Sequence, residues 1–282
     1  ILSFDDILII ARAAVKVGID KIRITGGEPL TRPDIVGLIS EIDKIKGIKD
    51  LSLTTNGVLL NELALPLFRA GLNRINVSLD SLKAERYREI TGGGRLSEVL
   101  KGIKEAKRVG FNPIKINNVP VRGLNDDEIE IFAKLTMNTD ISVRFIELMP
   151  IGSKELWKSG RGVPMSEVKK RVESIAPLIP QKIKGYGPAR YFKYRGGSGT
   201  IGFISAVTEH FCHECNRLRI TCDGRLRPCL FSDREIDLKK ALRSDRPEEE
   251  IEGLFRLAIT RKPKEHNLRH SNTLRPMSEI GG

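Results

Sequence analysis

The chain has 282 residues, of which 40% are hydrophobic and 5% aromatic, and it carries a formal net charge of +12. This length suffices to bury a large core, and no run approaches the roughly 18 apolar residues that cross a membrane. The opening segment, ILSFDDILII, also lacks the basic flank of a signal peptide, so we expect a cytoplasmic protein with no membrane association. The positive charge favours anionic partners. Because the basic residues are dispersed and aromatic side chains are scarce, a small polyphosphate is favoured over nucleic acid.

A repeat of strand and helix patterns fills the N-terminal part of the chain. Each repeat has a glycine that is expected to end a helix and precede a short β-rich run, and these glycines are Gly18, Gly47, Gly71 and Gly110. The helical patterns cover residues 4–17, 33–45, 61–70, 97–109 and 125–135, and a further strand is predicted over residues 139–147. Strand–helix units at this period predict parallel strands with crossover helices, in an open sheet or in a barrel.

Apolar and polar residues alternate in the same way within each predicted strand. The apolar positions are Ile22, Ile24, Leu51, Leu53, Ile75, Val77, Ile114 and Ile116. The polar positions are Arg23, Thr25, Ser52, Thr54, Asn76, Ser78, Lys115 and Asn117. Strands covered on both faces are nearly all apolar, so the alternation predicts one face against helices and one polar face lining a wet interior. We therefore expect Arg23 and Lys115 to reach into an open barrel.

Short loops follow these strands, and the ligand site of such a fold lies at the carboxyl ends of its strands. The loops read TGGEP, TTNG and SLDS, and we expect them to carry the site. The three glycines at residues 92–94 are predicted to form a flexible loop rather than a phosphate cradle, because no Lys-Ser or Lys-Thr pair follows them.

The sequence pattern changes after Glu147, where Pro, Gly and Lys become frequent. A helix is predicted over residues 165–175, a hairpin over residues 190–207 that turns at Gly196-Gly197, and a helix around residues 248–260. The change predicts a boundary between residues 150 and 160, which divides the chain into domains 1–155 and 156–282.

All four cysteines lie within one segment, FCHECNRLRITCDGRLRPCLF. Cys212 and Cys215 form a C-x2-C pair, and a strand–turn–strand return would bring Cys229 to them. This spacing fits zinc and an iron–sulfur cluster equally well, and His213 or Cys222 could complete a tetrahedral zinc site. For Cys222 we favour a small buried side chain in a strand over a fourth ligand.

Two arginines, Arg217 and Arg219, lie between the cysteines in the run NRLR. Their alternate spacing puts both guanidinium groups on one side of a strand, close to the metal. A planar guanidinium pairs with two oxygens at once, so these side chains suit a phosphate or a carboxylate. The segment therefore offers a metal centre beside an anion-binding site.

Several of these motifs coincide in one family. GGEP, TTNG and SLDS follow three successive strands, and CxxCNRxR-x9-C lies near the end of the chain. Together they resemble the radical S-adenosylmethionine (SAM) GTP 3′,8-cyclases of molybdenum cofactor biosynthesis, over essentially the whole chain. The resemblance implies an α/β fold with an incomplete (β/α)6 TIM-like barrel of the radical SAM type over residues 1–155. It also implies a C-terminal α+β iron–sulfur domain over residues 156–282.

The resemblance further implies roles for individual residues. A second four-iron four-sulfur cluster would be held by Cys212, Cys215 and Cys229, with one iron open to the guanine of GTP, so iron–sulfur replaces zinc as the expected centre. SAM would be held by Gly27, Ser78 and Met149. GTP would be contacted by Arg23, Thr54, Lys115, Arg217, Leu218 (through its backbone) and Arg219. The terminal Gly281-Gly282 would reach into the active site, and Cys222 falls at a non-ligand position.

The sequence departs from the family pattern at one point. The family holds its first cluster with a C-x3-C-x2-C motif, and the 282 residues contain none. We therefore expect a truncated chain that lacks the first strand and the cluster loop, and that is inactive without them. With both clusters, the implied reaction converts GTP into 3′,8-cyclo-7,8-dihydro-GTP, which passes to a cyclic pyranopterin monophosphate synthase. An electron donor is required, and a homodimer is compatible with the resemblance.

Two other functions are compatible with parts of the sequence. One is a radical SAM enzyme with an auxiliary cluster that acts on a peptide, which would need more C-terminal cysteines and would not need NRLR. The other is a zinc-stabilised RNA-binding protein, which would contain zinc and would bind RNA with strong salt dependence.

Overall fold

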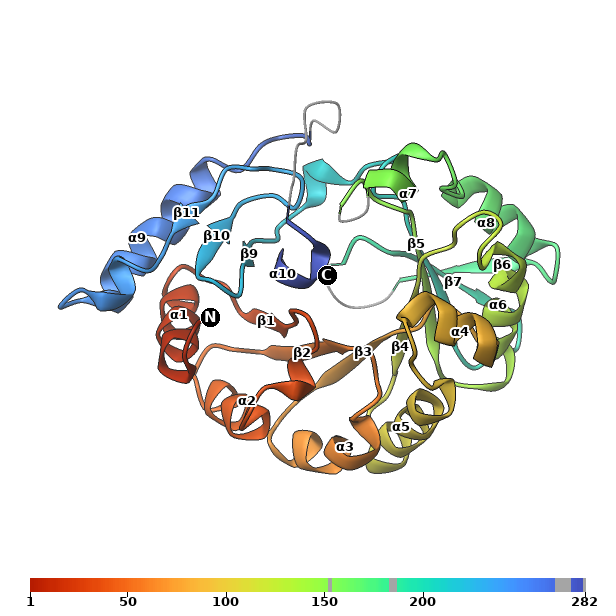
Figure 1. Cartoon of the computed structure of the whole chain (residues 1–282), viewed down its shortest axis with the longest axis horizontal. Coiled ribbons are helices and arrows are strands. Elements are labelled where there is room, and N and C mark those ends of the chain that lie inside the picture. The colour runs from red at the N-terminus through yellow and green to blue at the C-terminus, as the bar shows by residue number, and fades with distance from the viewer. Residues whose placement is uncertain (152–153, 183–186, 267–274, 281–282) are drawn as a thin grey trace. The chain divides into compact units, whose positions relative to one another are not determined.

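The computed structural model describes residues 1–151, 154–182, 187–266 and 275–280. These residues form two compact units, each assembled from separate segments of the chain (Figure 1). Unit 1 comprises residues 1–54, 66–73 and 215–282, and unit 2 comprises residues 55–65 and 74–214. The predicted boundary at residue 155 cuts the chain once, whereas these units are defined by contacts between separate segments. The predicted boundary therefore stays a prediction.

Unit 1 combines a parallel strand pair with a small antiparallel sheet. Strand β1 pairs in parallel with β2, with Ile22 opposite Leu51, and the second sheet has the order β11-β10-β9. The elements are α1 (Phe4–Lys16), β1 (Lys21–Ile24), α2 (Ile35–Asp43), β2 (Asp50–Thr55), β9 (Arg219–Ile220), β10 (Arg225–Arg227), β11 (Ile236–Asp237), α9 (Pro247–Thr260) and α10 (Met277–Ile280). Helix α3 (Leu60–Arg69) contains residues of both units.

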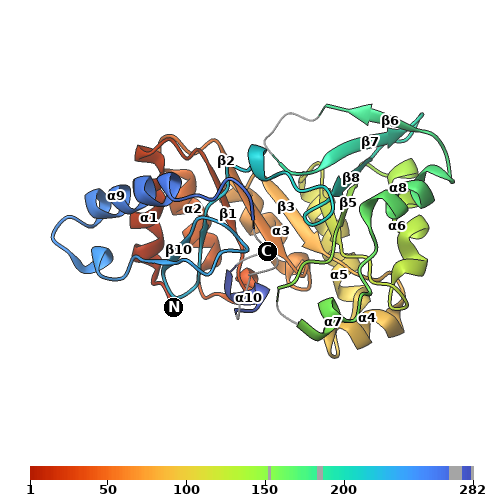
Figure 2. The same cartoon turned by 90° about the horizontal axis from the view of Figure 1, so that it is seen from above.

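The core of unit 1 lies between its first and its last long helix. Helix α1 begins at Ser3 with a capping box, in which the Ser3 hydroxyl accepts from the Asp6 N–H at 3.1 Å and the Asp6 carboxylate accepts from the Ser3 N–H at 2.9 Å. The apolar face of α1 packs on α9, and the two helices lie side by side in Figures 1 and 2. The buried residues that meet there are Ile10, Ala13, Ala14, Leu226, Leu238, Ala241, Leu242, Ile251, Phe255 and Ala258.

Unit 2 contains a six-stranded sheet with the order β3-β4-β5-β8-β7-β6. Strands β3, β4, β5 and β8 run parallel, whereas β7 and β6 are antiparallel to their neighbours. The elements are β3 (Arg74–Ser78), α4 (Ala84–Thr91), α5 (Leu96–Val109), β4 (Lys115–Asn118), α6 (Ile129–Asn138), β5 (Ser142–Ile146), α7 (Lys154–Lys158), α8 (Met165–Glu173), β6 (Leu178–Gln181), β7 (Arg190–Tyr194) and β8 (Thr200–Ile204).

The strand–helix repeat is confirmed. Each of its four glycines has a positive φ, between 86° at Gly18 and 116° at Gly110, which is the backbone conformation that lets a helix end and a strand begin. The predicted hairpin at Gly196 is also present, as β7 and β8. The features that were not predicted include the helices α4 and α7, the strand β6, and the parallel pairing of β8 with β5, which adds a further strand to the parallel sheet.

The predicted alternation of faces is confirmed by the strand register. In unit 2, Asn76 lies opposite Lys115, and Lys115 lies opposite Ser142, so the polar positions of neighbouring strands share one face. The apolar positions of β3 and β4 are at most 3% exposed. The polar face is more enclosed than expected, because Asn76 and Lys115 are only 1% and 7% exposed. In unit 1, by contrast, the Arg23 side chain is exposed on the edge strand β1.

Across the described residues, no helix combines the length and the apolar character needed to cross a lipid bilayer.

Candidate functional site

The segment with the four cysteines folds as the predicted strand–turn–strand return. Strands β9 and β10 pair antiparallel, with Arg219 opposite Arg227, and Thr221 and Gly224 close the turn through backbone hydrogen bonds. Cys215 precedes β9 and Cys229 follows β10, so the hairpin brings the ends that carry these two cysteines back to the same side. The return accounts for the long spacing between them.

Three arginines of unit 1 meet at this hairpin. Burial, together with the like charges of Arg217 and Arg23, lowers the pKa of Arg219 to about 9. The side chains of Cys215 and Cys229 act in the opposite direction on the same guanidinium. The site is therefore a crowded cationic cluster that an anion would stabilise.

Cys215 has the character of a metal ligand. Burial of the thiol opposes its ionisation, but hydrogen bonds from the backbone and side chain of Arg217, with the charges of Arg217 and Lys262, outweigh this and lower the pKa of Cys215. A thiolate is the form of cysteine that binds metals. Since Cys215 and Cys229 both act on Arg219, their chemistry and placement fit a shared cluster.

The third predicted ligand, Cys212, lies in a 3₁₀ turn (Cys212–Glu214) at the end of unit 2. The described part of the chain contains no group of three or more His, Cys, Asp or Glu side chains arranged to hold a metal ion. The three-cysteine ligand set remains a prediction.

The expectation for Cys222 was wrong. This cysteine is exposed and lies in the turn between β9 and β10, whereas a buried strand position was expected. Its neighbour Thr221 takes the buried position, at 0% exposed, and accepts the Arg225 N–H at 2.9 Å. Strand β9 ends at Ile220, so the alternation of buried and exposed residues along the strand does not continue to Cys222.

A second group of polar side chains lies on the sheet of unit 2. The Lys115 ammonium lies over the ring of Tyr191, 5.9 Å from its centroid. Arg144 is buried and donates from Nη2 to the Asn76 amide oxygen at 2.6 Å. Burial lowers the pKa of Arg144, since few of its surroundings compensate the charge. Sequence reasoning missed Arg144.

A signal for Arg144 did exist in the sequence. The register puts Arg144 opposite Asn117 and Ser142 opposite Lys115, so β5 continues the polar face of β4. The alternation in SVRFI would have given the same result, but no glycine opens this strand and it was not aligned with the others. Among the described residues, the Asn117 amide oxygen and Arg144 Nε are buried without a hydrogen-bond partner.

The predicted SAM-binding residues lie at or after strand ends, as expected for such a fold. Gly27 follows β1 and is exposed, Ser78 ends β3 and is exposed, and Met149 follows β5 and is partly buried. Glu28, beside Gly27, caps the next turn, because its carboxylate accepts the Leu30 N–H at 3.0 Å. Their contacts with SAM are untested predictions, and the terminal Gly281-Gly282 lies outside the described residues.

A partly buried carboxylate follows Ser78 in the SLDS loop. Burial raises the pKa of Asp80 to about 6, although the Val119 N–H donates to its carboxylate at 2.8 Å and partly offsets this. Glu128, at 0% exposed, accepts from the Ser81 hydroxyl and the Leu82 N–H, both at 2.7 Å. These bonds hold the loop against the start of α6.

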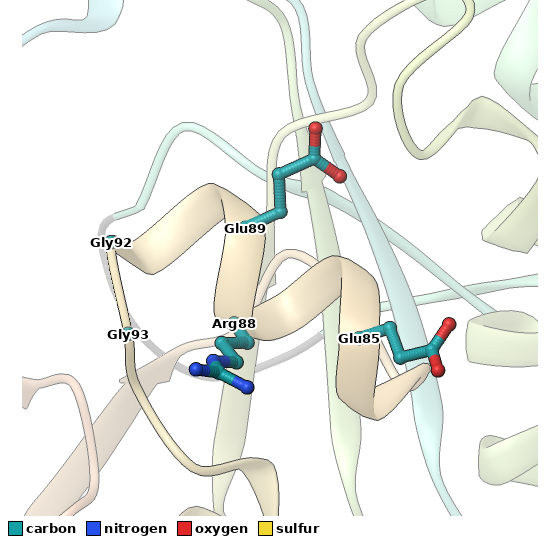
Figure 3. Close-up of a pocket in the computed structure, with 5 residues that line it drawn as sticks. All are labelled: Glu85, Arg88, Glu89, Gly92 and Gly93. Carbon is teal, nitrogen blue, oxygen red and sulfur yellow. The ribbon is translucent and has the colours of Figure 1, made fainter.

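The three glycines at residues 92–94 end helix α4. The N–H groups of Gly92 and Gly93 donate to the last carbonyls of the helix, and Gly92 is left-handed with a φ of 69°. Figure 3 shows the surface depression beside them, which is lined by Glu85, Arg88 and Glu89. The free carbonyls of a helix C-terminus repel phosphate, so the interpretation as a loop rather than a phosphate cradle agrees with the geometry.

Comparison with known proteins shows which families the chain is similar to. The model of the Radical SAM superfamily matches residues 1–136, and that of Molybdenum Cofactor Synthesis C matches residues 141–268. The chain is 50% identical to the GTP 3′,8-cyclase of Thermodesulfovibrio yellowstonii and 48% identical to that of Pelotomaculum thermopropionicum. These alignments cover 100% of this chain and 87% and 88% of the two relatives.

A solved structure shares the fold. The crystal structure of Streptococcus suis SuiB bound to S-adenosylmethionine matches with a TM-score of 0.58 at 16% identity, over 89% of this chain and 61% of that chain. At this identity the likeness concerns the fold alone. It confirms the predicted class, an α/β fold of the incomplete-barrel radical SAM type.

Proposed function

Because this chain belongs to the GTP 3′,8-cyclase family of the radical SAM superfamily, we propose that it binds GTP and takes part in its conversion to 3′,8-cyclo-7,8-dihydro-GTP. This conversion is the first step of molybdenum cofactor biosynthesis, and the C-terminal match to Molybdenum Cofactor Synthesis C supports it. One observation carries the proposal for the site: three arginines and two cysteines of unit 1 interact at one hairpin.

The triphosphate of GTP binds at the arginine cluster. Arg217, Arg219 and Arg23 repel one another, and a ligand with several negative charges removes that repulsion. The backbone of Leu218 runs between Arg217 and Arg219, while its side chain packs against the core of unit 1, which supports a role for its backbone alone. Anion binding is therefore supported by the charge and burial of the site.

The remainder of GTP contacts the polar faces of the strands. Thr54 and Lys115 are the proposed contacts, at 8% and 7% exposed, and both lie on the face that alternates with the buried apolar one. Arg144 joins them, because it is a buried cation on the same face of unit 2 as Lys115. Buried donors of this kind bind a polar ligand more strongly than exposed ones do.

Two iron–sulfur clusters and SAM complete the enzyme in this proposal. Membership of the radical SAM superfamily implies one cluster and SAM, which together supply the radical that removes hydrogen from the substrate. The second cluster is held by Cys212, Cys215 and Cys229, and SAM by Gly27, Ser78 and Met149. The protein's own part is to orient GTP, to neutralise its charge and to exclude water.

Further partners follow from the chemistry. An electron donor must reduce the first cluster, and a synthase must take up the cyclised nucleotide to form cyclic pyranopterin monophosphate. The four cysteines are free thiols, which suits assembly of a cluster in the reducing cytoplasm. A homodimer is compatible with these roles.

The test is to measure iron and sulfide per chain on anaerobically purified protein and to add GTP while the cluster spectrum is recorded. Roughly four irons, as one cubane cluster contains, and a spectrum that changes with GTP would support the cluster as the substrate site. Zinc without a response to GTP would contradict the cyclase proposal and favour a structural metal centre. RNA binding that weakens steeply with salt would then favour the RNA-binding alternative.

A further inference from the structure

Lys262 connects the two loops that carry Cys215 and Cys229. Its Nζ donates to the backbone carbonyl of Arg217 at 2.7 Å and to that of Pro228 at 2.7 Å. Arg217 lies two residues after Cys215, and Pro228 directly precedes Cys229. One ammonium group therefore bridges two segments that are distant in sequence and that each bear a predicted metal ligand.

The lysine itself is held from elsewhere in the unit. Lys262 lies two residues after the end of α9, and its N–H donates to the carbonyl of Ile259 at 3.2 Å. Helix α9 is fixed by its buried residues Ile251, Phe255 and Ala258, which pack in the core with α1. Because α9 packs on α1 as well as on β10 of the hairpin, Lys262 is fixed to the body of the unit and can impose a spacing on the two loops.

A second contact joins the same segments. The ring of Phe231, two residues after Cys229, meets that of His266 edge to face, with centroids 4.8 Å apart. The stretch that follows α9 therefore touches the Cys229 loop at two points, one polar and one aromatic. Lys262 alone also reaches the Cys215 loop, and its charge acts on the Cys215 thiol.

We propose that Lys262 is a positioning residue of the C-terminal metal centre, which ties the Cys215 loop to the Cys229 loop and holds their sulfur atoms at the spacing of a cluster. The inference rests on the proposed function, since it assumes that these cysteines bind iron. A lysine suits the task because its compact ammonium has three donors, and charge-assisted bonds to two carbonyls hold both backbones at once. Its positive charge also offsets the negative charge of the thiolates.

The test compares Lys262→Met with the parent, after anaerobic reconstitution of the full chain with iron and sulfide. Loss of the cluster to a chelator is followed by absorbance, and iron is counted at the start. Removal of outer partners of metal ligands costs about 10- to 100-fold in metal affinity, so the variant should lose iron about tenfold faster. Lys264→Met removes an exposed lysine two residues away and should behave as the parent does.

Conservative variants separate positioning from a general loss of structure. Lys262→Arg keeps the charge and can donate to both carbonyls, so it should retain the cluster within about threefold of the parent. Lys262→Gln keeps an amide donor group without the charge, so its rate of iron loss should lie between those of the Arg and Met variants. Thermal unfolding of the metal-free proteins shows whether each variant folds. If Lys262→Met does not fold, the rates of iron loss of Lys262→Gln and Lys262→Arg are compared instead.

The outcomes distinguish this inference from the function on which it rests. A parent that binds iron, with a Lys262→Met variant that holds it equally long, would overturn the role of Lys262 and leave the cluster in place. A parent that cannot be loaded with iron would overturn both. Slower loss in Lys262→Arg than in Lys262→Met, with an unchanged Lys264→Met, would support the inference.

Discussion

Arg144 on β5 donates to Asn76 on β3 at 2.6 Å, although β4 lies between these two strands. The guanidinium must therefore extend over β4, across the polar face of the sheet. Both residues are buried, at 6% and 1% exposed. The bond orients a guanidinium whose charged form is disfavoured by burial. Arg144 Nε has no hydrogen-bond partner among the described residues.

The first prediction concerns Arg144. Arg144→Met should weaken GTP binding about 10- to 100-fold, since a hydrogen bond to a charged group contributes about 1.5–3 kcal/mol. The variant should fold as well as the parent, because it removes a buried charge that is costly to desolvate. Calorimetric titration with GTP measures the effect, and Arg108→Met, on an exposed arginine of α5, is the control. Unchanged affinity would exclude Arg144 from the site.

The second prediction concerns the arginine cluster. Arg217→Ala and Arg219→Ala should each weaken GTP binding by about tenfold or more, and the loss should be smaller for guanosine, which has no phosphates. Arg246→Ala, at an arginine whose side chain is 76% exposed, should have no effect. Equal losses for GTP and guanosine would show that these arginines do not contact the triphosphate.

The third prediction is a pH dependence that originates from Asp80. Its pKa is about 6 in the folded protein against an ordinary value of 3.8, so the folded state binds the proton more tightly and stability falls as the pH rises through this range. Asp80→Asn keeps the oxygen that accepts the Val119 N–H but cannot ionise. The variant should be more stable than the parent at pH 7.5, and its advantage should shrink by about 1 kcal/mol at pH 5.

Urea unfolding at pH 5, 6 and 7.5 checks this prediction. The parent should gain stability as the pH is lowered, while Asp80→Asn should change little over the same range. A parent whose stability is flat from pH 7.5 to 5, in parallel with the variant, would contradict the raised pKa of Asp80.

The fourth prediction has the opposite sign and concerns Asp6. The Arg243 side chain pairs with this carboxylate, with Nη2 at 3.1 Å from Oδ2, and holds the pKa of Asp6 well below its usual value. A lowered pKa gives stability that is present above about pH 4 and is lost as the pH falls further. Asp6→Asn should therefore cost about 1–2 kcal/mol at pH 7, a modest figure because Arg243 is 67% exposed and water screens the pair.

Thermal unfolding from pH 7 down to pH 3 provides the measurement. The difference between the parent and Asp6→Asn should narrow below about pH 4, where this carboxylate becomes protonated in the unfolded chain but stays ionised in the folded parent. Asp5→Asn, at the exposed neighbouring position in the same helix turn, serves as the control. A difference that does not narrow at all between pH 7 and pH 3 would assign the effect to helix capping rather than to charge.

Much of the fold was predictable because it is encoded locally. The glycines that end helices and the alternation along strands gave the parallel units, and the cysteine spacing gave the β9–β10 return. Helix α4 was not predicted, because Tyr87 is its one buried residue in the described structure and its sequence therefore shows little apolar periodicity. The pairing of β8 with β5 was not predicted, because two strands that are far apart in the sequence leave no local signal of their pairing.

The site was predictable only in part, for a related reason. The motif residues are side chains of recognisable chemistry, whereas Lys262 acts on backbone carbonyls that have no signature in the sequence. Cys222 was misjudged because the turn at Thr221 interrupts the alternation. The contacts of the remaining motif residues with SAM, GTP and iron stay predictions.

The packing of α1 against α9 has a consequence for biosynthesis. Translation delivers Ile10, Ala13 and Ala14 long before Ile251 and Phe255, the residues that cover them in the core. Unit 1 therefore cannot complete its core before α9 has been synthesised, whereas residues 74–214 of unit 2 emerge as one uninterrupted stretch. Until then the apolar face of α1 stays uncovered, so the nascent chain needs protection from aggregation until α9 has emerged.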